Sequence, residues 1–93
     1  MDAIQVRRFT METKQWSVEL YISEDATDTD VRAVLFSGRQ QKTTGHGHAR
    51  RNPADRRIPE IGDELAVARA LADLADRLQG IASEDIAELA GPA

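Results

Sequence analysis

The sequence predicts a small α+β protein in which two helices cover one face of a three-stranded antiparallel sheet. Two runs, residues 16–23 and 30–36, alternate between apolar and polar residues with the period of a half-buried strand. A later run, residues 63–80, repeats its apolar residues every three or four positions, as a helix on a sheet does. The 93 residues make one domain. A domain this small buries only about 60–65% of its chain surface, so dimerisation is a common remedy.

The first strand is predicted over WSVELYIS, residues 16–23. One face of it carries Trp16, Val18, Leu20 and Ile22. We expect this face to lie in the core, with Trp16 included. Tyr21 lies on the opposite face, among polar residues.

The polar turn EDATDTD leads into a second strand, DVRAVLF, which pairs antiparallel to the first. Its two faces carry Val31, Ala33 and Leu35 on one side, and Arg32, Val34 and Phe36 on the other. After a Ser37-Gly38 turn, the run RQQKTTGHGHARR is polar and contains two glycines, which favours a loop. Its position after two strands favours a third strand instead, and we expect that strand.

A turn follows at Asn52-Pro53-Ala54-Asp55, because asparagine suits the first turn position and proline the second. Pro59 keeps Ile58 extended. Together with Gly62 and Asp63, the residues Asn52, Pro53 and Asp55 form the predicted set of turn and capping residues.

The main helix is predicted over residues 63–80, capped by Asp63 and ended by Gly80. Its apolar stripe is Val67, Leu71, Leu74 and Leu78. Ser83 is expected to cap a short second helix, SEDIAELA, which packs through Ile86 and Leu89. The element order is therefore β-β-β-α-α.

Residues 1–14 show no clear period and are expected to form a mobile arm before a single domain at 15–90, with 91–93 as a tail. The chain has no cysteine, which excludes disulfides and thiolate sites. No run is apolar enough for a signal peptide or a membrane span, so we expect a cytoplasmic protein.

Charge is unevenly distributed along the chain. Residues 39–57 carry six basic residues against one acid, +5, whereas residues 58–93 carry −6 and residues 1–38 carry −3, which gives the net −4. The basic residues are Arg39, Lys42, Arg50, Arg51, Arg56 and Arg57. A concentrated basic segment attracts phosphate even on an acidic protein. The alternative is that these side chains are solvated and paired with acids of the helices.

His46 and His48 are two residues apart and share a strand face, so they could contribute to a metal site. Such a site needs further ligands, and exposed histidines on an edge strand are favoured instead. No nucleophile elbow, phosphate-binding glycine loop or Ser-His-Asp set is present, so no enzyme, cofactor or small-molecule substrate is expected. Few aromatic residues are available for base stacking, which favours contact with the nucleic-acid backbone.

The region from Ala49 to Leu71 is distinctive in the order of its residues as well as in its composition. Its blocks are Ala49-Arg50, Asn52-Pro53-Ala54-Asp55-Arg56, Pro59-Glu60-Ile61-Gly62-Asp63-Glu64-Leu65 and Ala68-Arg69-Ala70-Leu71. They resemble the signature of a family of small actinobacterial proteins with a domain of unknown function, whose members include dormancy- and hypoxia-induced proteins of mycobacteria. The resemblance covers roughly residues 15–90.

The resemblance implies a double-stranded-RNA-binding-domain-like (dsRBD-like) fold, and some members resemble ribosome hibernation promoting factors. It implies stress or dormancy physiology, a ribosomal partner, and Arg50 and Arg56 as contact residues. The sequence departs from a duplex-RNA binder in that its main helix opens with Asp63 and Glu64, which repel phosphate. In addition, residues 1–14 do not resemble the N-terminal helix of such a domain, and His46 and His48 stand where a more apolar strand is expected.

We therefore expect a non-enzymatic stress- or dormancy-associated homodimer that contacts the ribosome or RNA phosphate through an arginine-rich edge formed by the third strand and the turn after it. The alternative is a homodimeric protein-interaction module with no nucleic-acid role. Tyr21, Val34 and Phe36 lie on the sheet face away from the helices, and apolar residues on both faces favour a second covering layer.

Overall fold

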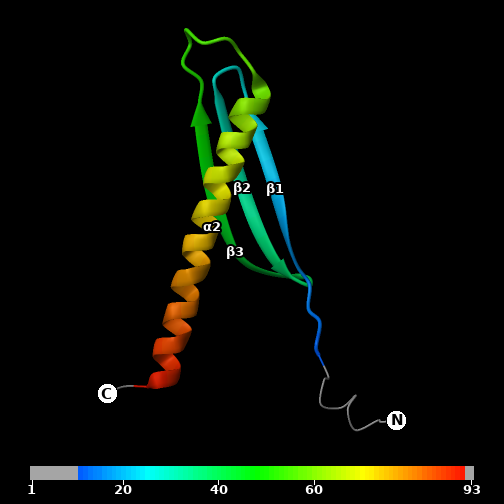
Figure 1. Cartoon of the computed structure of the whole chain (residues 1–93), viewed down its shortest axis with the longest axis vertical. Helices are drawn as coiled ribbons and strands as arrows, with labels where there is room; N and C mark the ends of the chain where they lie inside the picture. Colours follow the sequence, from blue (N-terminus) through cyan, green and yellow to red (C-terminus); the bar gives the residue numbers. More distant parts are fainter. Residues whose placement is uncertain (1–10, 92–93) are drawn as a thin grey trace.

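The computed structural model describes residues 11–91. Strands β1 (Trp16–Glu24), β2 (Asp28–Ser37) and β3 (Gln40–Arg50) form an antiparallel sheet in the order β1-β2-β3, and helix α2 (Pro59–Ala90) lies on one face of it (Figure 1). The predicted α+β class and three-stranded antiparallel sheet are confirmed. The polar segment after Gly38 is a strand, as its position predicts.

The register of the sheet places the alternating apolar residues of β2 on the face toward α2. Val31 pairs with Ile22 on one side and Gly47 on the other, and Ala33 pairs with Leu20 and Gly45. The β1–β2 turn is fixed by Asp25, whose Oδ1 accepts the N–H groups of Thr27 and Asp28, both at 2.8 Å. These two bonds hold the pKa of Asp25 below its usual range.

Two glycines of β3 allow α2 to approach the sheet closely. A β-carbon on Gly45 would lie 2.7 Å from the Cα of Leu74, and one on Gly47 would lie 2.9 Å from the Cα of Ala70. The glycines that favour a loop by propensity are therefore packing residues, because no side chain fits between β3 and the helix backbone.

The core is small and lies between β2, β3 and the first half of α2. It consists of Val31, Ala33, Leu35, Ala49, Ala66, Ala70 and Leu74. The predicted helix stripe is therefore wrong in part: Leu74 is buried, Val67 and Leu78 pack only partly, and Leu71 is 40% exposed. Because β3 presents glycines, the helix turns its alanines toward the sheet, and the leucine side is rotated toward β1.

The two predicted helices are one continuous helix of 32 residues. A glycine inside a helix costs only about 1 kcal/mol relative to alanine, so Gly80 does not end it. Ser83 lies inside the helix rather than at a cap. The helix ends before Gly91, which has φ 74° and donates its N–H to the Glu88 carbonyl at 3.1 Å.

The predicted helix start is also wrong, because α2 begins four residues before Asp63. Pro59 occupies the first turn, where its missing N–H costs nothing, and Ile58 precedes it in an extended conformation without a side-chain cap. Asp63 therefore lies one turn inside the helix rather than at its cap.

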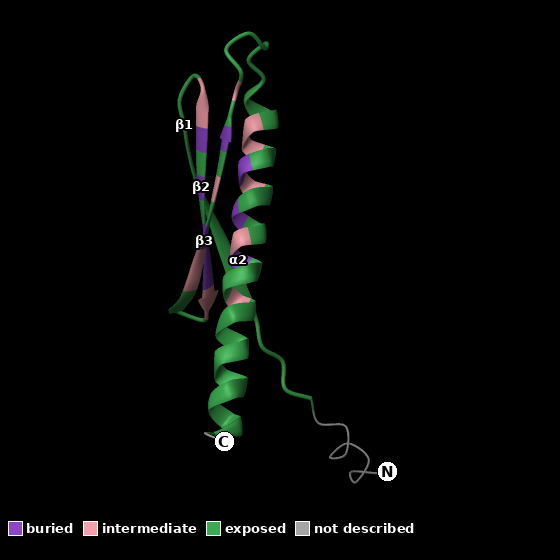
Figure 2. Cartoon of the chain, turned by 90° about the vertical axis from the view of Figure 1, so that its left-hand side faces the viewer, coloured by how far each residue is buried: buried purple, intermediate pink, exposed green. Residues whose placement is uncertain are grey.

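Strand β1 is largely uncovered on its α2-facing side, where α2 contacts little of it beyond Glu24. Trp16 is 46% exposed, so its predicted place in the core is wrong. Ile86 and Leu89, predicted to pack against the sheet, are 67% and 88% exposed. Figure 2 shows α2 continuing as an exposed rod beyond the buried part of the molecule. The reason is that one straight helix cannot fold back as two short ones would.

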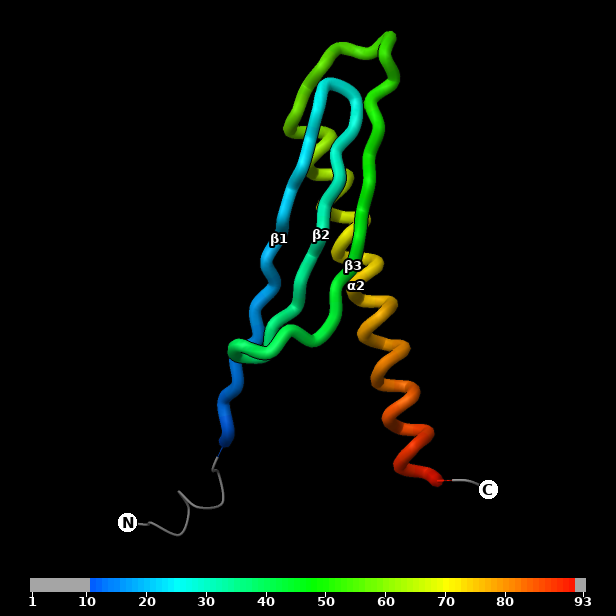
Figure 3. Tube along the Cα trace, turned by 180° about the vertical axis from the view of Figure 1, so that it is seen from behind, coloured from blue at the N-terminus to red at the C-terminus, as the bar shows by residue number. Residues whose placement is uncertain are grey.

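The opposite face of the sheet is open in the view of Figure 3, where α2 lies behind the strands. Val34 on this face is nevertheless buried, at 2% exposure, whereas Tyr21 is 46% exposed. The Arg32 guanidinium lies over the Tyr21 ring, 4.8 Å from its centroid.

The predicted arm, residues 1–14, falls largely outside the described residues, as do residues 92–93 of the predicted tail; residues 11–14 are exposed and precede β1. No helix within residues 11–91 has the length and apolar character needed to cross a membrane.

Candidate functional site

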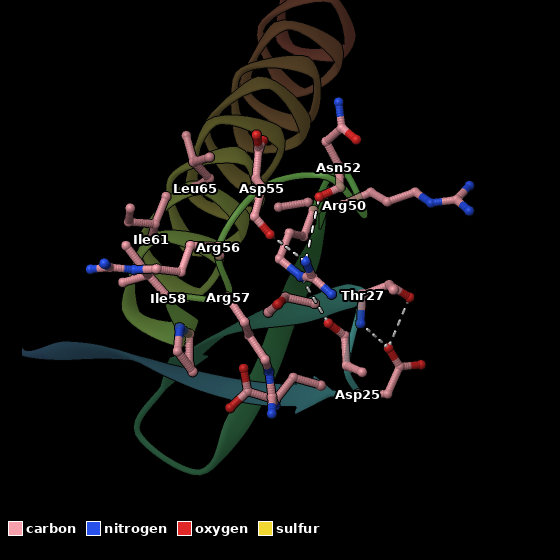
Figure 4. A pocket seen from close by; sticks show the side chains of 17 residues that line it. Asp25, Thr27, Arg50, Asn52, Asp55, Arg56, Arg57, Ile58, Ile61 and Leu65 are labelled. Carbon is pink, nitrogen blue, oxygen red and sulfur yellow. Dashed lines mark hydrogen bonds between the residues drawn. The ribbon is translucent and has the colours of Figure 1, made fainter.

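A pocket of about 400 Å³ lies at the end of the sheet where β1 meets β2 and β3 leads into α2 (Figure 4). Its walls come from the β1–β2 turn, the loop at residues 51–58 and the first turns of α2. Its charged lining residues are Glu24, Asp25, Arg50, Arg51, Asp55, Arg56 and Arg57, and its apolar ones include Ile58, Ile61 and Leu65. A pocket of this size, lined by both apolar and charged side chains, is typical of a binding site.

Arg51 holds the loop in place. Its Nη1 donates to the carbonyl of Asp55 at 2.6 Å and its Nε to the carbonyl of Ala26 at 3.2 Å. Its backbone N–H donates to Thr27 at 2.7 Å. One side chain therefore ties the β3–α2 loop to the β1–β2 turn, and its guanidinium donates to backbone carbonyls of both segments.

The turn at Asn52-Pro53-Ala54-Asp55 forms where the sequence predicts it. The Asn52 side-chain oxygen accepts the N–H of Ala54 at 3.0 Å, and the Asn52 carbonyl accepts that of Asp55 at 2.9 Å. This combination of side-chain and backbone bonds is the usual chemistry of an asparagine-proline turn. It redirects the chain from β3 toward α2.

A pair of carboxyl groups adjoins the pocket. The Glu24 side chain lies in hydrogen-bonding contact with the Asp63 carboxyl, which raises the pKa of Glu24, while the charge of Arg57 opposes the rise. Asp63 Oδ1 is buried and accepts no hydrogen bond from an N–H or hydroxyl group of the described residues. Because a second carboxyl group lies beside it, the protonated form of Glu24 is favoured.

Gly62 permits this arrangement. A β-carbon on it would lie 2.9 Å from the hydroxyl oxygen of Thr29, a buried residue of β2. The predicted role of Gly62 in a turn is replaced by close packing of the first helical turns on β2, which brings Asp63 to Glu24.

The six basic residues singled out in the sequence do not form one surface. Arg50, Arg51, Arg56 and Arg57 line the pocket, whereas Arg39 and Lys42 lie at the opposite end of β3. The 11 residues of β3 span roughly 35 Å. The Lys42 Nζ lies 5.2 Å from the centroid of the Trp16 ring, so this lysine already has a partner.

The two histidines lie on the face of β3 away from α2. His48 bridges two carboxylates of β2, with Nδ1 2.8 Å from Asp30 and Nε2 3.2 Å from Asp28. Within residues 11–91, no group of three or more histidine, cysteine, aspartate or glutamate side chains is arranged to hold a metal ion. The histidines alternate with Gly45 and Gly47, so the motif places small residues inward and polar ones outward.

Sequence reasoning missed the polar contacts between α2 and β3. Asp73 accepts the backbone N–H of His46 at 2.8 Å and the Arg77 Nε at 2.9 Å, which lower its pKa. Arg69 donates to the His48 carbonyl at 2.7 Å. Asp73, Arg77 and Arg69 lie at spacings of four residues on one helix face, but such spacing is equally typical of a solvated face.

The fold and site define a class of small α+β proteins in which a meander of three strands is crossed by one long helix, with a charged pocket at the sheet end. The chain belongs to the Rv2632c-like family, whose model matches residues 14–93. It is 47% identical over 73 residues to the uncharacterized protein Mb1767 of Mycobacterium bovis, covering 78% of this chain and 77% of that protein.

A second relative is the uncharacterized protein Rv2632c of Mycobacterium tuberculosis, 45% identical over 74 residues, with 78% of this chain and 77% of the relative covered. The crystal structure of Rv2632c matches this fold with a TM-score of 0.78 at 37% identity, and covers 89% of this chain and 98% of the other. The actinobacterial family expected from the sequence is thereby confirmed.

Proposed function

We propose that the protein is a non-enzymatic binding protein of stress or dormancy physiology that contacts RNA phosphates, and through them the ribosome, with the arginines of the pocket. The observation that supports this is the gathering of Arg50, Arg56 and Arg57 around a loop that Arg51 holds in shape. Arginine forks bind phosphate best when their backbone is already positioned. The stress role, the ribosomal partner, the cytoplasmic location and the dsRBD-like fold rest on the family resemblance and the composition.

The proposal assigns different roles to the arginines. Arg51 donates to backbone carbonyls, so it acts through the loop rather than on phosphate. Arg57 lies close to Glu24 and Asp25, where its charge opposes the rise in the pKa of Glu24 and adds to the lowering of the pKa of Asp25, so part of its charge is already neutralised. Arg50 and Arg56 are exposed and carry the main contact. Binding through so few charges is weak, insensitive to sequence and sensitive to salt.

Ribosome co-sedimentation at low salt tests the proposal with two variants of equal charge change. Reversing Arg50 and Arg56 to glutamate should abolish sedimentation with ribosomes, because both phosphate contacts become repulsive. Reversing Arg39 and Lys42, at the other end of β3, should leave it nearly intact. Equal loss in both variants, or no sedimentation of the unaltered protein, contradicts the proposal.

A second candidate function is a homodimeric interaction module without a nucleic-acid role. It is favoured by the uncovered apolar face of β1, where Val18, Leu20 and Ile22 are each more than 40% exposed. Light scattering combined with an RNA titration across salt concentrations separates the two candidates. A steep salt slope supports phosphate contact, and tight dimerisation with no RNA binding supports the second candidate.

A further inference from the structure

The face of β1 toward α2 is apolar and largely exposed, and together with the facing side of α2 it is here called the trough. Its floor is formed by Trp16, Val18, Leu20 and Ile22, which the register places beside the buried residues of β2. Leu71 and Leu78 of α2 lie on the side of the helix turned toward β1 and form its wall; Leu71 is 40% exposed. α2 packs on β3 and β2 and barely touches β1.

The trough has room for one more helix. Packed helices lie about 8–10 Å apart, and two strand spacings across a sheet span about 9.6 Å. A helix beside α2 would therefore lie over β1. Figure 1 shows α2 diverging from β1 along its length, so that the two elements lie farthest apart at the N-terminal end of β1.

The same chain carries a helix without a surface to pack on. Residues 79–90, here called the overhang, are all exposed, and they include Ile81, Ile86 and Leu89. An isolated helical segment of about 12 residues is marginal in water, because tertiary packing supplies most helical stability. Within one copy of the chain, the apolar side chains of the overhang and those of the trough are therefore both left uncovered.

Charge identifies the occupant as a second copy of this chain. The overhang carries Glu84, Asp85 and Glu88 and no basic residue. The wide end of the trough is flanked by Arg39 and Lys42, and the Lys42 Nζ already lies over Trp16. An acidic helix entering a trough with a basic mouth is complementary in sign as well as in apolar surface.

We propose that two copies dimerise by exchanging overhangs, each laid in the trough of the other. A two-fold axis perpendicular to the sheet, beyond the Trp16 end, brings the two together. In the view of Figure 1, β1 and the overhang diverge toward the same end of the molecule, so this rotation places each overhang over the other β1. The contact is isologous and closes as a dimer.

The exposed apolar surface supplies a large part of a dimer interface. Eight large apolar side chains of the trough and the overhang are between 37% and 88% exposed: Trp16, Val18, Leu20, Ile22, Leu71, Ile81, Ile86 and Leu89. Their exposed fractions are equivalent to about four fully exposed side chains per copy. A standard interface buries about 800 Å² per partner, so the polar residues between these side chains supply the rest.

The proposal rests on the second candidate function and specifies the surfaces through which its homodimer forms. It is independent of RNA binding. The arginines of the pocket lie at the far end of β3, so phosphate contact and dimerisation can fail separately.

Cysteine cross-linking tests the contact directly, because the chain has no cysteine of its own. A Val18→Cys chain mixed with an Ile86→Cys or a Leu89→Cys chain should form a disulfide-linked heterodimer under mild oxidation. A Tyr21→Cys chain, with its thiol on the opposite face of β1, should not cross-link to either partner. Absence of the first cross-link, or equal yield in the control, overturns the proposal.

Sedimentation equilibrium with charge reversal gives a second, reciprocal test. A chain with Arg39→Glu and Lys42→Glu, and a chain with Glu84→Lys and Glu88→Lys, should each dimerise at least tenfold more weakly than the unaltered protein. An equimolar mixture should recover the original affinity, since both contacts of the mixed dimer then pair opposite charges. A monomeric unaltered protein, or a mixture no tighter than its components, contradicts the exchange.

Discussion

The Cα of Ala70 lies 2.9 Å from the point where a side chain on Gly47 would begin. This contact sets the position of α2 on the sheet. It explains why the polar stretch before the turn is a strand despite its composition: each glycine faces the helix, and each histidine faces away from it.

Replacing Gly47 with alanine should destabilise the protein by about 1–3 kcal/mol, the usual cost of overpacking. The β-carbon would meet helix backbone, which cannot rotate away as a side chain can. Urea denaturation followed by circular dichroism measures the loss. An unchanged midpoint would show that α2 does not approach β3 this closely.

Gly80→Ala should have the opposite effect and stabilise by about 0.5–1 kcal/mol. No atom within 4 Å opposes a β-carbon at Gly80, and its φ is not in the left-handed region. The same urea experiment serves as the measurement. Destabilisation would indicate that the helix ends at Gly80, as the sequence alone predicts.

Arg51→Ala should cost roughly 0.5–1.5 kcal/mol, because it removes the hydrogen bonds that tie the loop to the β1–β2 turn at the surface. Arg50→Ala is the matched control, since it changes the same residue type one position earlier, and the Arg50 side chain makes no hydrogen bond or ion pair within residues 11–91; its midpoint should stay close to that of the unaltered protein. Thermal denaturation of both variants measures the difference. Equal losses would contradict the assignment of Arg51 to loop structure.

The contact between Glu24 and Asp63 should make stability depend on pH. Because the pKa of Glu24 is raised in the folded protein above its ordinary 4.5, the contact stabilises the protein at low pH, where Glu24 is protonated, and this stabilisation is lost as pH rises through the folded pKa. Glu24→Gln supplies a permanent donor, so it should stabilise at pH 7 and lose that advantage toward pH 4.

Denaturation midpoints of this variant across that pH range give the measurement, with Glu64→Gln as a control on an exposed helix position. A Glu24→Gln protein less stable than the original at pH 7 would contradict the carboxyl pairing.

The sheet could be predicted because β1 and β2 alternate strictly, and β3 could be predicted from its position in the meander. The rotation of α2 about its own axis, which decides which side chains face the sheet, could not be predicted. The period of Val67, Leu71, Leu74 and Leu78 identifies a helix but not which side of it the sheet contacts. That choice depends on Gly45 and Gly47, more than twenty residues away in sequence.

The basic residues near the site could be predicted from the sequence, but their arrangement in space could not. Charge counting located the basic segment, but a strand separates Arg39 and Lys42 from the pocket arginines by its full length. Asp63 satisfies the sequence pattern of a helix cap equally well whether the helix starts beside it or four residues earlier. Its contact with Glu24 depends on Gly62 packing against Thr29.

The central functional claim is that Arg50 and Arg56 contact RNA phosphate, and the most direct measurement is the salt dependence of RNA affinity. The unaltered protein, Arg50→Glu/Arg56→Glu and Arg39→Glu/Lys42→Glu would each be titrated against a structured RNA at several salt concentrations, with oligomeric state checked by light scattering. The account predicts an affinity that falls with salt for the unaltered protein and for the Arg39 and Lys42 variant. It predicts no measurable binding for the Arg50 and Arg56 variant. A salt-independent affinity, or one that the Arg50 and Arg56 reversal leaves unchanged, would contradict it.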